Sequence, residues 1–190
     1  MASGRGTNFE ALACADKQRL FYPLQIVGLV TNRKDAGARL IAKKYGIPDY
    51  LVDSSRFKTE RGFDRKAYET ELKECLLGLA PDWICLAGYM LVLGTDIIRA
   101  FSGKIVNIHP SLLPKHKGLR PQQQALEAGD PVTGCTVHFV TEELDGGPVI
   151  LQKSLPILPE ETEESLSRRL LPLEHQTYVE ALKILAAQRA

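Results

Sequence analysis

Two patterns of hydrophobic and polar positions alternate along this chain. Short continuous apolar runs predict buried strands, and longer amphipathic stretches between them predict helices. Strands are expected at 25–31, 50–52, 83–87, 104–108, 135–140 and 149–155. Helices are expected at 9–19, 36–45, 63–79, 95–100, 122–128 and 161–187. Strands that alternate with helices predict an α/β fold with a parallel sheet.

Single residues refine this outline. Gly46 is a helix stop, Pro81 halts the third helix, and Pro172 is expected to bend the last one. The run 135–140 alternates apolar and polar residues, which favours an antiparallel or edge strand. We therefore predict an open, mostly parallel twisted sheet with helices on both faces, a Rossmann-like arrangement with antiparallel strands late in the chain.

The N-terminal end departs from this pattern. A Gly-rich loop that leads into a helix normally follows a first β-strand, which is central in a doubly wound sheet. Here the loop starts at residue 3, with only Met1 and Ala2 before it. Loss of a central strand would leave backbone groups unpaired in the core. We therefore expect that the first strand is missing because the start is truncated.

Composition narrows the class of protein. The 190 residues are enough for one domain, expected to span 1–190, and 44% of them are hydrophobic. A net charge of +1 gives no reason to expect nucleic acid or a membrane surface as partner. The N-terminal residues do not show the pattern of a signal peptide. The cysteines are widely spaced, so we expect free thiols in a cytoplasmic protein and no metal site.

The strongest chemical signal lies in the segments IVNIHPSLLP, 105–114, and LDGGPVI, 144–150. Asn107 and His109 are two residues apart on a predicted strand, so their side chains point to the same face. Asp145 stands in a loop before another strand. An amide, an imidazole and a carboxylate can stabilise an oxyanion, move a proton and orient the imidazole. The sequence Asp-Gly-Gly is also a turn signal, and the two interpretations are compatible.

Two loops are candidate ligand sites. In SGRGTN, 3–8, the glycines permit close approach, and the following helix offers free N–H groups to a phosphate. Phe9 stands where a dinucleotide site needs a third glycine, so a monophosphate is favoured; the alternative is a plain turn with a helix cap. The loop 88–93, GYMLVL, suits a flat heteroaromatic ring, and core packing is an equally good interpretation.

The other histidines are weaker candidates. His116 lies in a Lys-rich segment and is expected in solvent. His138 is expected to be a packed or rim residue of its strand, and His175 lies on the last helix. Their spacing does not resemble a metal site.

Four segments together resemble the folate-dependent formyltransferases, and most closely the branch that formylates glycinamide ribonucleotide in purine biosynthesis. They are SGRGTNFEAL, LAGYMLVL, IVNIHPSLLPKHKGL and VHFVTEELDGGPVILQ. The resemblance covers nearly the whole chain. It implies direct transfer of the formyl group of 10-formyltetrahydrofolate to an amine, without a covalent enzyme intermediate. It also implies small-molecule substrates, a monomer or homodimer, and no metal.

The same resemblance assigns roles to residues. It implies that the catalytic residues are Asn107, His109 and Asp145. It places the substrate phosphate and ribose on Gly6, Thr7, Asn8 and Glu174. It places the folate on Met90, Leu91, Val92, Leu93, Asn107, Thr141, Glu142, Glu143, Leu144 and Asp145. Asn107 and protonated His109 would stabilise the tetrahedral intermediate.

The chain also departs from the family. Leu91 replaces a common arginine, and Arg61 is only a loose match to an arginine that contacts folate. The pair Arg120-Pro121 is similar to the branch that acts on methionyl-tRNA. That formyltransferase, a formyltetrahydrofolate hydrolase, and a truncated chain that binds folate without turnover remain as alternatives.

Overall fold

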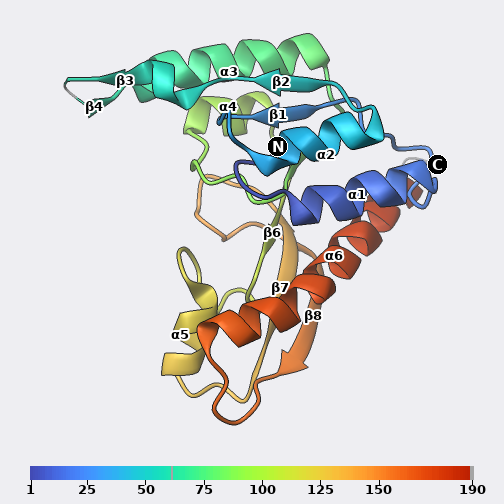
Figure 1. Ribbon diagram of the computed structural model, residues 1–190, viewed down its shortest axis with the longest axis vertical. Helices are drawn as coiled ribbons and strands as arrows, with labels where there is room; N and C mark the ends of the chain where they lie inside the picture. Colours follow the sequence, from blue (N-terminus) through green and yellow to red (C-terminus); the bar gives the residue numbers. More distant parts are fainter. Residues whose placement is uncertain (61, 189–190) are drawn as a thin grey trace.

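The structure, a computed structural model, describes residues 1–60 and 62–188. One sheet pairs two strands in parallel, β1 (Leu29–Thr31) and β2 (Asp49–Leu51). A second sheet has the order β5 (Ile84–Leu86), β6 (Ile105–His109), β7 (Val132–Phe139) and β8 (Val149–Pro156). In this sheet β5 and β6 are parallel, whereas β6 with β7 and β7 with β8 are antiparallel. A small hairpin of β3 (Lys58–Thr59) and β4 (Gly62–Phe63) projects from the body (Figure 1).

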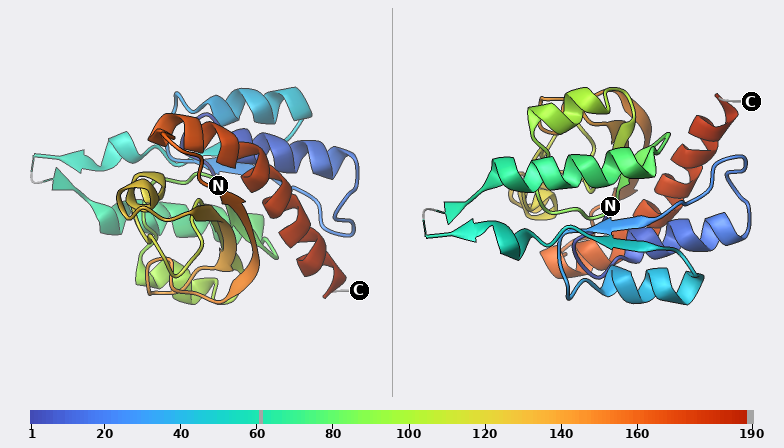
Figure 2. Two further views of the ribbon diagram at one scale, coloured as in Figure 1. Left: turned by 90° about the horizontal axis from the view of Figure 1, so that it is seen from below. Right: turned by 90° about the horizontal axis from the view of Figure 1, so that it is seen from above.

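Helices cover both faces of these sheets. They are α1 (Thr7–Lys17), α2 (Gly37–Tyr45), α3 (Arg65–Leu79), α4 (Thr95–Ala100), α5 (Pro121–Glu127) and α6 (Glu163–Ala187), with a 3-10 turn at Ser54–Phe57. One buried cluster joins α1, α2 and α6, and a second joins α3 and α4, so two cores lie on opposite sides (Figure 2). The α/β fold with helices on both faces is therefore confirmed. Among the helices within residues 1–60 and 62–188, none combines the length and hydropathy needed to cross a membrane.

Local signals explain most helix ends. Gly46 ends α2 in the left-handed conformation with φ 69°. The third helix begins at Arg65 and not at Phe63, because Asp64 caps it and Phe63 belongs to the hairpin. Thr162 starts α6 with a capping box. The last helix changes direction along its length, as expected for a helix that contains Pro172 (Figure 2).

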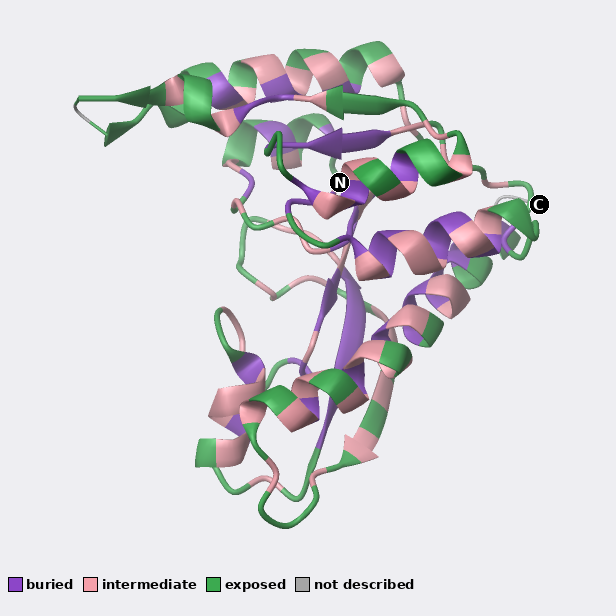
Figure 3. Ribbon diagram, viewed as in Figure 1, coloured by how far each residue is buried: buried purple, intermediate pink, exposed green. Residues whose placement is uncertain are grey.

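One strand prediction needs correction, and another is confirmed. The expected strand 25–31 is regular only at Leu29–Thr31; before it, the Ile26 N–H donates to the Asp16 carboxylate instead of to a strand. The prediction of an antiparallel or edge strand over 135–140 is confirmed in its first form: β7 is antiparallel to both of its neighbours, β6 and β8. Its side chains are buried on both faces, whereas β8 is partly exposed (Figure 3).

Met1 and Ala2 connect the two sheets. The Ala2 N–H donates to the Val30 carbonyl of β1 at 3.2 Å, and the Ala87 N–H donates to the Met1 carbonyl at 2.8 Å. The α-ammonium of Met1 donates to the Cys85 carbonyl of β5. Since Met1, β5 and β6 run in one direction, the loops that follow them meet at one edge, where α/β proteins bind ligands.

This buried terminus leads to a pH prediction. Burial lowers the pKa of the Met1 α-ammonium from 8.0 to about 6, and burial also lowers the pKa values of His138 and His175. Because the unfolded chain then binds protons more tightly, stability is full above pH 8 and is lost as the pH falls towards 6. We expect a loss of about 2 kcal/mol from Met1. Urea unfolding at pH 8 and pH 6 measures it.

A chain with an acetylated α-amino group is the matched control. It carries no titrating terminus in either state, so the change between pH 8 and 7 should disappear. A free energy of unfolding that stays constant or rises as the pH falls would contradict the prediction.

Candidate functional site

The site begins on β6, which is central in its sheet. Asn107 pairs with His138 of β7 across the antiparallel ladder, and His109 pairs with Thr136. His109 is buried, with 6% of its surface exposed. The structure therefore confirms that Asn107 and His109 lie at the carboxyl end of a strand, on the same face.

The loop between β7 and β8 brings a carboxylate to this strand. Asp145 Oδ2 lies 3.4 Å from His109 Nδ1, and both side chains are almost completely buried. The Gly118 N–H donates to the same Oδ2 at 2.9 Å. Asp145 has φ 49°, a conformation that Asp tolerates better than most residues. These two contacts hold the carboxylate towards the imidazole.

Close backbone approach makes a glycine necessary in this loop. A Cβ on Gly147 would stand 1.9 Å from the Phe139 carbonyl oxygen. That distance is far below van der Waals contact, so a side chain at 147 forces the loop away from β7. The Asp-Gly-Gly segment is therefore both a turn and a device that sets the position of Asp145.

The other nitrogen of His109 also faces an acceptor. His109 Nε2 lies 2.9 Å from the His116 carbonyl oxygen. With a carboxylate at Nδ1 and a carbonyl at Nε2, the doubly protonated imidazolium has an acceptor for each N–H. His116 was expected in solvent, and this is wrong. It is half-buried, and its own Nε2 lies 2.8 Å from Asp130 Oδ2.

A second histidine belongs to the cluster, and the sequence did not single it out. His138 Nε2 lies 3.4 Å from Asn107 Nδ2 and 3.6 Å from Asp145 Oδ1. Burial lowers the pKa of His138, and its Nδ1 lies 2.9 Å from the Phe139 carbonyl. A neutral ring with Nδ1–H therefore leaves Nε2 to accept from the Asn107 amide. The sequence showed that His138 lies on a strand, but the register that places it opposite Asn107 is visible only in the structure.

The N-terminal loop forms a second part of the site. Gly6 has φ 81° and caps α1, and a Cβ there would stand 2.7 Å from the Ala38 Cβ. Asn8 on the first turn donates from Nδ2 to Glu174 Oε2 at 2.8 Å. Burial raises the pKa of Glu174, which the Asn8 bond partly opposes. The structure thus brings Asn8 and Glu174 together from opposite ends of the chain, and Asn8 Oδ1 has no protein partner within the described residues.

The loop 88–93 was interpreted either as a ligand site or as core, and each interpretation holds for part of it. Met90 and Val92 expose 72% and 59% of their surface, whereas Leu93 is buried in the core. The Met90 N–H donates to Ser3 Oγ at 2.9 Å, so this loop touches the N-terminal loop. Leu91 is half-buried against the second core. Core packing, which was the alternative for Met90, Leu91 and Leu93, is therefore correct for Leu93 and wrong for Met90.

The first turns of α3 hold this loop from outside. Arg65 Nη1 donates to the Val92 carbonyl at 2.9 Å and also to Glu69 Oε1. The hydroxyl of Tyr68 contacts the hydroxyl of Tyr89. Sequence reasoning missed Arg65; its place directly after a helix cap was the only available signal. The weaker candidate, Arg61, lies outside the described residues.

The loop 141–145 lies on the same side of β6 as the loop 88–93 (Figure 1). Glu142 pairs with Arg99 of α4 at 2.8 Å, and Glu143 pairs with Lys117 at 2.6 Å. Leu144 is half-exposed, and the Thr141 hydroxyl donates to the Glu143 carbonyl. Two ion pairs therefore tie this loop to the elements before and after β6.

An open α/β sheet with an imidazole, an amide and a carboxylate at one edge defines a class: α/β proteins that bind small ligands at the carboxyl ends of their strands. The formyl transferase family matches residues 1–182, and the chain belongs to that family.

Individual relatives agree with this assignment. The phosphoribosylglycinamide formyltransferase of Haemophilus influenzae is 40% identical over 96% of this chain and 84% of its own length. The crystal structure of glycinamide ribonucleotide transformylase 1 from Symbiobacterium toebii matches with a TM-score of 0.91 and 39% identity, over 99% of this chain and 86% of that one. The trifunctional purine biosynthetic protein adenosine-3 of Drosophila pseudoobscura is 40% identical over 98% of this chain. This chain spans only 13% of the length of that relative.

Proposed function

We propose that this protein transfers the formyl group of 10-formyltetrahydrofolate to the amine of glycinamide ribonucleotide, a step of purine biosynthesis. Relatives that match most of the chain carry the name of this activity. The observation that carries the proposal is the buried contact between His109 and Asp145, 3.4 Å apart, beside Asn107. An imidazole N–H and an amide N–H side by side suit a reaction that develops negative charge on a carbonyl oxygen.

The proposed chemistry is direct acyl transfer. The substrate amine attacks the formyl carbon and forms a tetrahedral intermediate with negative charge on the formyl oxygen. His109 exchanges its His116 acceptor for that oxygen and donates from Nε2, and the Asn107 amide donates beside it. Asp145 orients the imidazolium and balances its charge. The C–N bond to the folate then breaks, the attacking nitrogen loses one proton, and the folate nitrogen gains one.

The two ligand regions follow from the same geometry. Gly6 caps α1, and Thr7 and Asn8 begin its first turn, where free N–H groups and the helix dipole favour a phosphate. Glu174 beside Asn8 would accept from ribose hydroxyls. The folate would lie between the loops 88–93 and 141–145, with Met90 and Val92 offering exposed apolar surface. None of these roles requires a metal ion.

The remaining expectations concern the extent of the domain, its location in the cell and its oligomeric state. We propose one formyltransferase domain over 1–190, acting on small molecules in the cytoplasm as a monomer or homodimer. Sedimentation of the purified protein decides between the two assemblies.

Replacing Asn8 by alanine tests the nucleotide region. The variant removes the donor to Glu174 and leaves a buried carboxylate without its partner, so binding of glycinamide ribonucleotide should weaken. We expect its KM to rise about 10-fold with kcat and the folate KM nearly unchanged. Steady-state kinetics with each substrate varied in turn measure this.

Glu10→Ala is the matched control on the same helix. Its carboxylate pairs with Lys44 on the surface, away from the loop, so its kinetics should equal those of the parent protein. A rise in the folate KM alone in Asn8→Ala would mean that this loop does not hold the nucleotide.

Absorbance during deformylation of 10-formyltetrahydrofolate tests the activity itself. Turnover that requires glycinamide ribonucleotide supports the transferase. Turnover without an acceptor would favour the hydrolase, and turnover only with methionyl-tRNA would favour the other branch. Absence of turnover together with folate binding in a titration would leave the binding-only alternative.

A further inference from the structure

The loop that follows β6 carries two backbone groups of the candidate site. The His116 carbonyl lies 2.9 Å from His109 Nε2, and the Gly118 N–H donates to Asp145 Oδ2 at 2.9 Å. The loop 110–118 therefore contacts both members of the pair through its backbone. Any displacement of this loop moves the acceptor of one residue and the donor of the other. The contacts that hold the loop thus also set the geometry of the site.

One hydroxyl of β7 fixes the start of this loop. Thr136 lies directly opposite His109 in the antiparallel ladder, and it is completely buried. Its Oγ1 donates to the Ser111 carbonyl at 2.6 Å and accepts from the Leu113 N–H at 3.1 Å. Gln152 Nε2 of β8 donates to the same Oγ1 at 2.8 Å. Since a hydroxyl has one donor and two acceptor positions, all three are used.

A second contact joins β8 to the same loop. Gln152 Nε2 also donates to the Leu113 carbonyl at 3.0 Å, so both backbone groups of Leu113 are bonded to side chains of the sheet. The strand β7 also allows the loop to approach closely. A Cβ on Gly134 would stand 2.6 Å from Leu112 Cδ2. Hydrogen bonds and close packing together fix the loop on the two strands.

The start of the loop is connected to His116 by two further bonds. Ser111 Oγ donates to the Lys115 carbonyl at 2.6 Å, and the Lys115 N–H donates to the Leu112 carbonyl at 3.1 Å. These bonds fold the segment into a compact turn that ends next to His116. The Thr136 hydroxyl therefore holds one end of a bonded unit, and the carbonyl that faces the imidazole lies at the other end.

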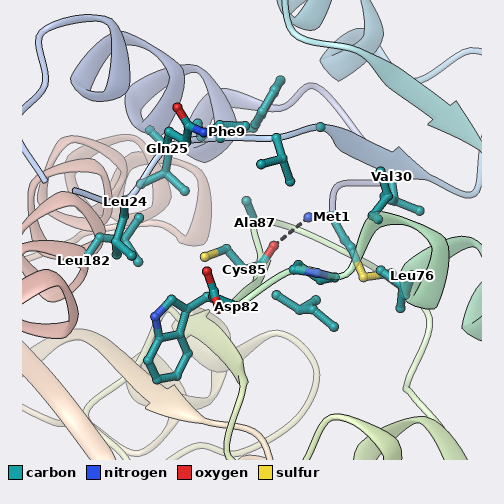
Figure 4. Close-up of a pocket in the computed structure, with 18 of the residues that line it drawn as sticks. Met1, Phe9, Leu24, Gln25, Val30, Leu76, Asp82, Cys85, Ala87 and Leu182 are labelled. Atoms are coloured by element: carbon teal, nitrogen blue, oxygen red, sulfur yellow. Dashed lines mark hydrogen bonds between the residues drawn. The ribbon is translucent and has the colours of Figure 1, made fainter. Parts of the chain in front are cut away.

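The cavity of about 490 Å³ in the molecule lies apart from this loop. Phe9, Cys85 and Leu182 are among its lining residues, whereas Thr136 and the loop 110–118 are not (Figure 4). The cavity therefore offers the loop no space to move into when a contact is lost. The position of the loop depends on its contacts with β7 and β8.

We propose that Thr136 is a positioning residue of the proposed formyl transfer, and that Gln152 supports it. The Thr136 hydroxyl fixes the loop 110–118 and, through it, the backbone groups that face His109 and Asp145. Since all three hydrogen-bonding positions of the hydroxyl are taken, Thr136 acts through the loop and not on a substrate. The inference rests on the proposed function, because the loop affects turnover only if His109 and Asp145 are catalytic.

Thr136→Val and Thr136→Ser test the hydroxyl. Valine has nearly the same shape, but it leaves the Ser111 carbonyl and the Leu113 N–H buried without their partner. We expect kcat to fall about 10-fold in Thr136→Val, with the KM of both substrates nearly unchanged. Serine keeps the hydroxyl, so Thr136→Ser should retain most of the parent activity. The imidazole resonances of His109 in the NMR spectrum of the ligand-free protein should shift only in Thr136→Val.

Thr133→Val is the matched control on the same strand. The Thr133 hydroxyl is also buried, but it has no hydrogen-bond partner within residues 1–60 and 62–188. The same substitution should therefore leave kcat and the His109 resonances as they are in the parent protein. Equal losses of kcat in Thr133→Val and Thr136→Val would overturn the proposal, because the packing of β7 would then explain both.

Gln152→Met decides the question if Thr136→Val does not fold. Methionine has a similar length but no amide, so the Leu113 carbonyl loses its donor while Thr136 keeps its bonds to the loop. We expect shifted His109 resonances and a fall in kcat of about 3-fold. Unchanged resonances in Gln152→Met, and in Thr136→Val where it folds, would overturn the proposal. Shifted resonances in a protein whose parent form has no transferase activity would refute the proposed function instead, because the resonances are measured without substrate.

Discussion

His109→Ala is expected to lower kcat by about 10²- to 10³-fold while the KM of each substrate changes little. The reason is that the imidazolium would act on charge that develops only after the amine attacks, so its loss affects the transition state more than the bound substrates. Asn107→Ala removes the second donor, and Asp145→Ala removes the group 3.4 Å from His109 Nδ1, so both should behave in the same way. Single-turnover kinetics separate this chemical step from binding and release.

His116→Asn is the matched control for this series. It removes a neighbouring imidazole but keeps the backbone carbonyl that accepts from His109, so kcat should stay close to that of the parent protein. Near-normal kcat in all three alanine variants would refute the assignment of the catalytic trio. A fall in kcat for His116→Asn as large as that for His109→Ala would show that loss of packing explains both.

Gly147→Ala is expected to reduce activity by about 10²-fold without any change to a reacting group. The new methyl would stand 1.9 Å from the Phe139 carbonyl, so the loop must move and carry Asp145 away from His109. Loss of the close fit should also destabilise the fold by about 1 to 3 kcal/mol. Kinetics and urea unfolding of the same protein measure the two effects.

Gly78→Ala provides the comparison. It makes the same change in α3, where a Cβ meets nothing within 4 Å, so activity should be unaffected and stability should rise slightly. Normal kcat for Gly147→Ala would mean that the loop can place Asp145 beside His109 without a glycine at position 147.

Prediction from the sequence succeeded where neighbours along the chain carry the information. The helix Thr95–Ala100 has the predicted bounds, and Asn107 and His109 share a face because a strand has a period of two. Asp145 was expected near His109 because the two glycines that follow it let the loop fold back towards the imidazole. The turn at Asp145 and Gly147 was also visible, since these residue types tolerate tight loops.

Errors occurred where a partner distant in the sequence decides the outcome. The segment before Leu29 has strand-like residues, but Ile26 bonds to a side chain of α1 instead. His138 is packed, as predicted, but only the pairing of β7 with β6 places it opposite Asn107. Arg65 acquires a role only because α3 packs beside the loop that contains Val92.

The sequence by itself determined the α/β class, most of the helices, and the residue types available for formyl transfer. These follow from local periodicity, capping and turn chemistry, which act within a few residues. Only the tertiary structure decided that Asn8 meets Glu174 and that His138 joins Asn107 and Asp145. Such contacts depend on the order of the strands in the sheet and on how the loops fold over the sheet. They join residues that are far apart in the sequence, and local sequence patterns carry no information on which of these residues meet.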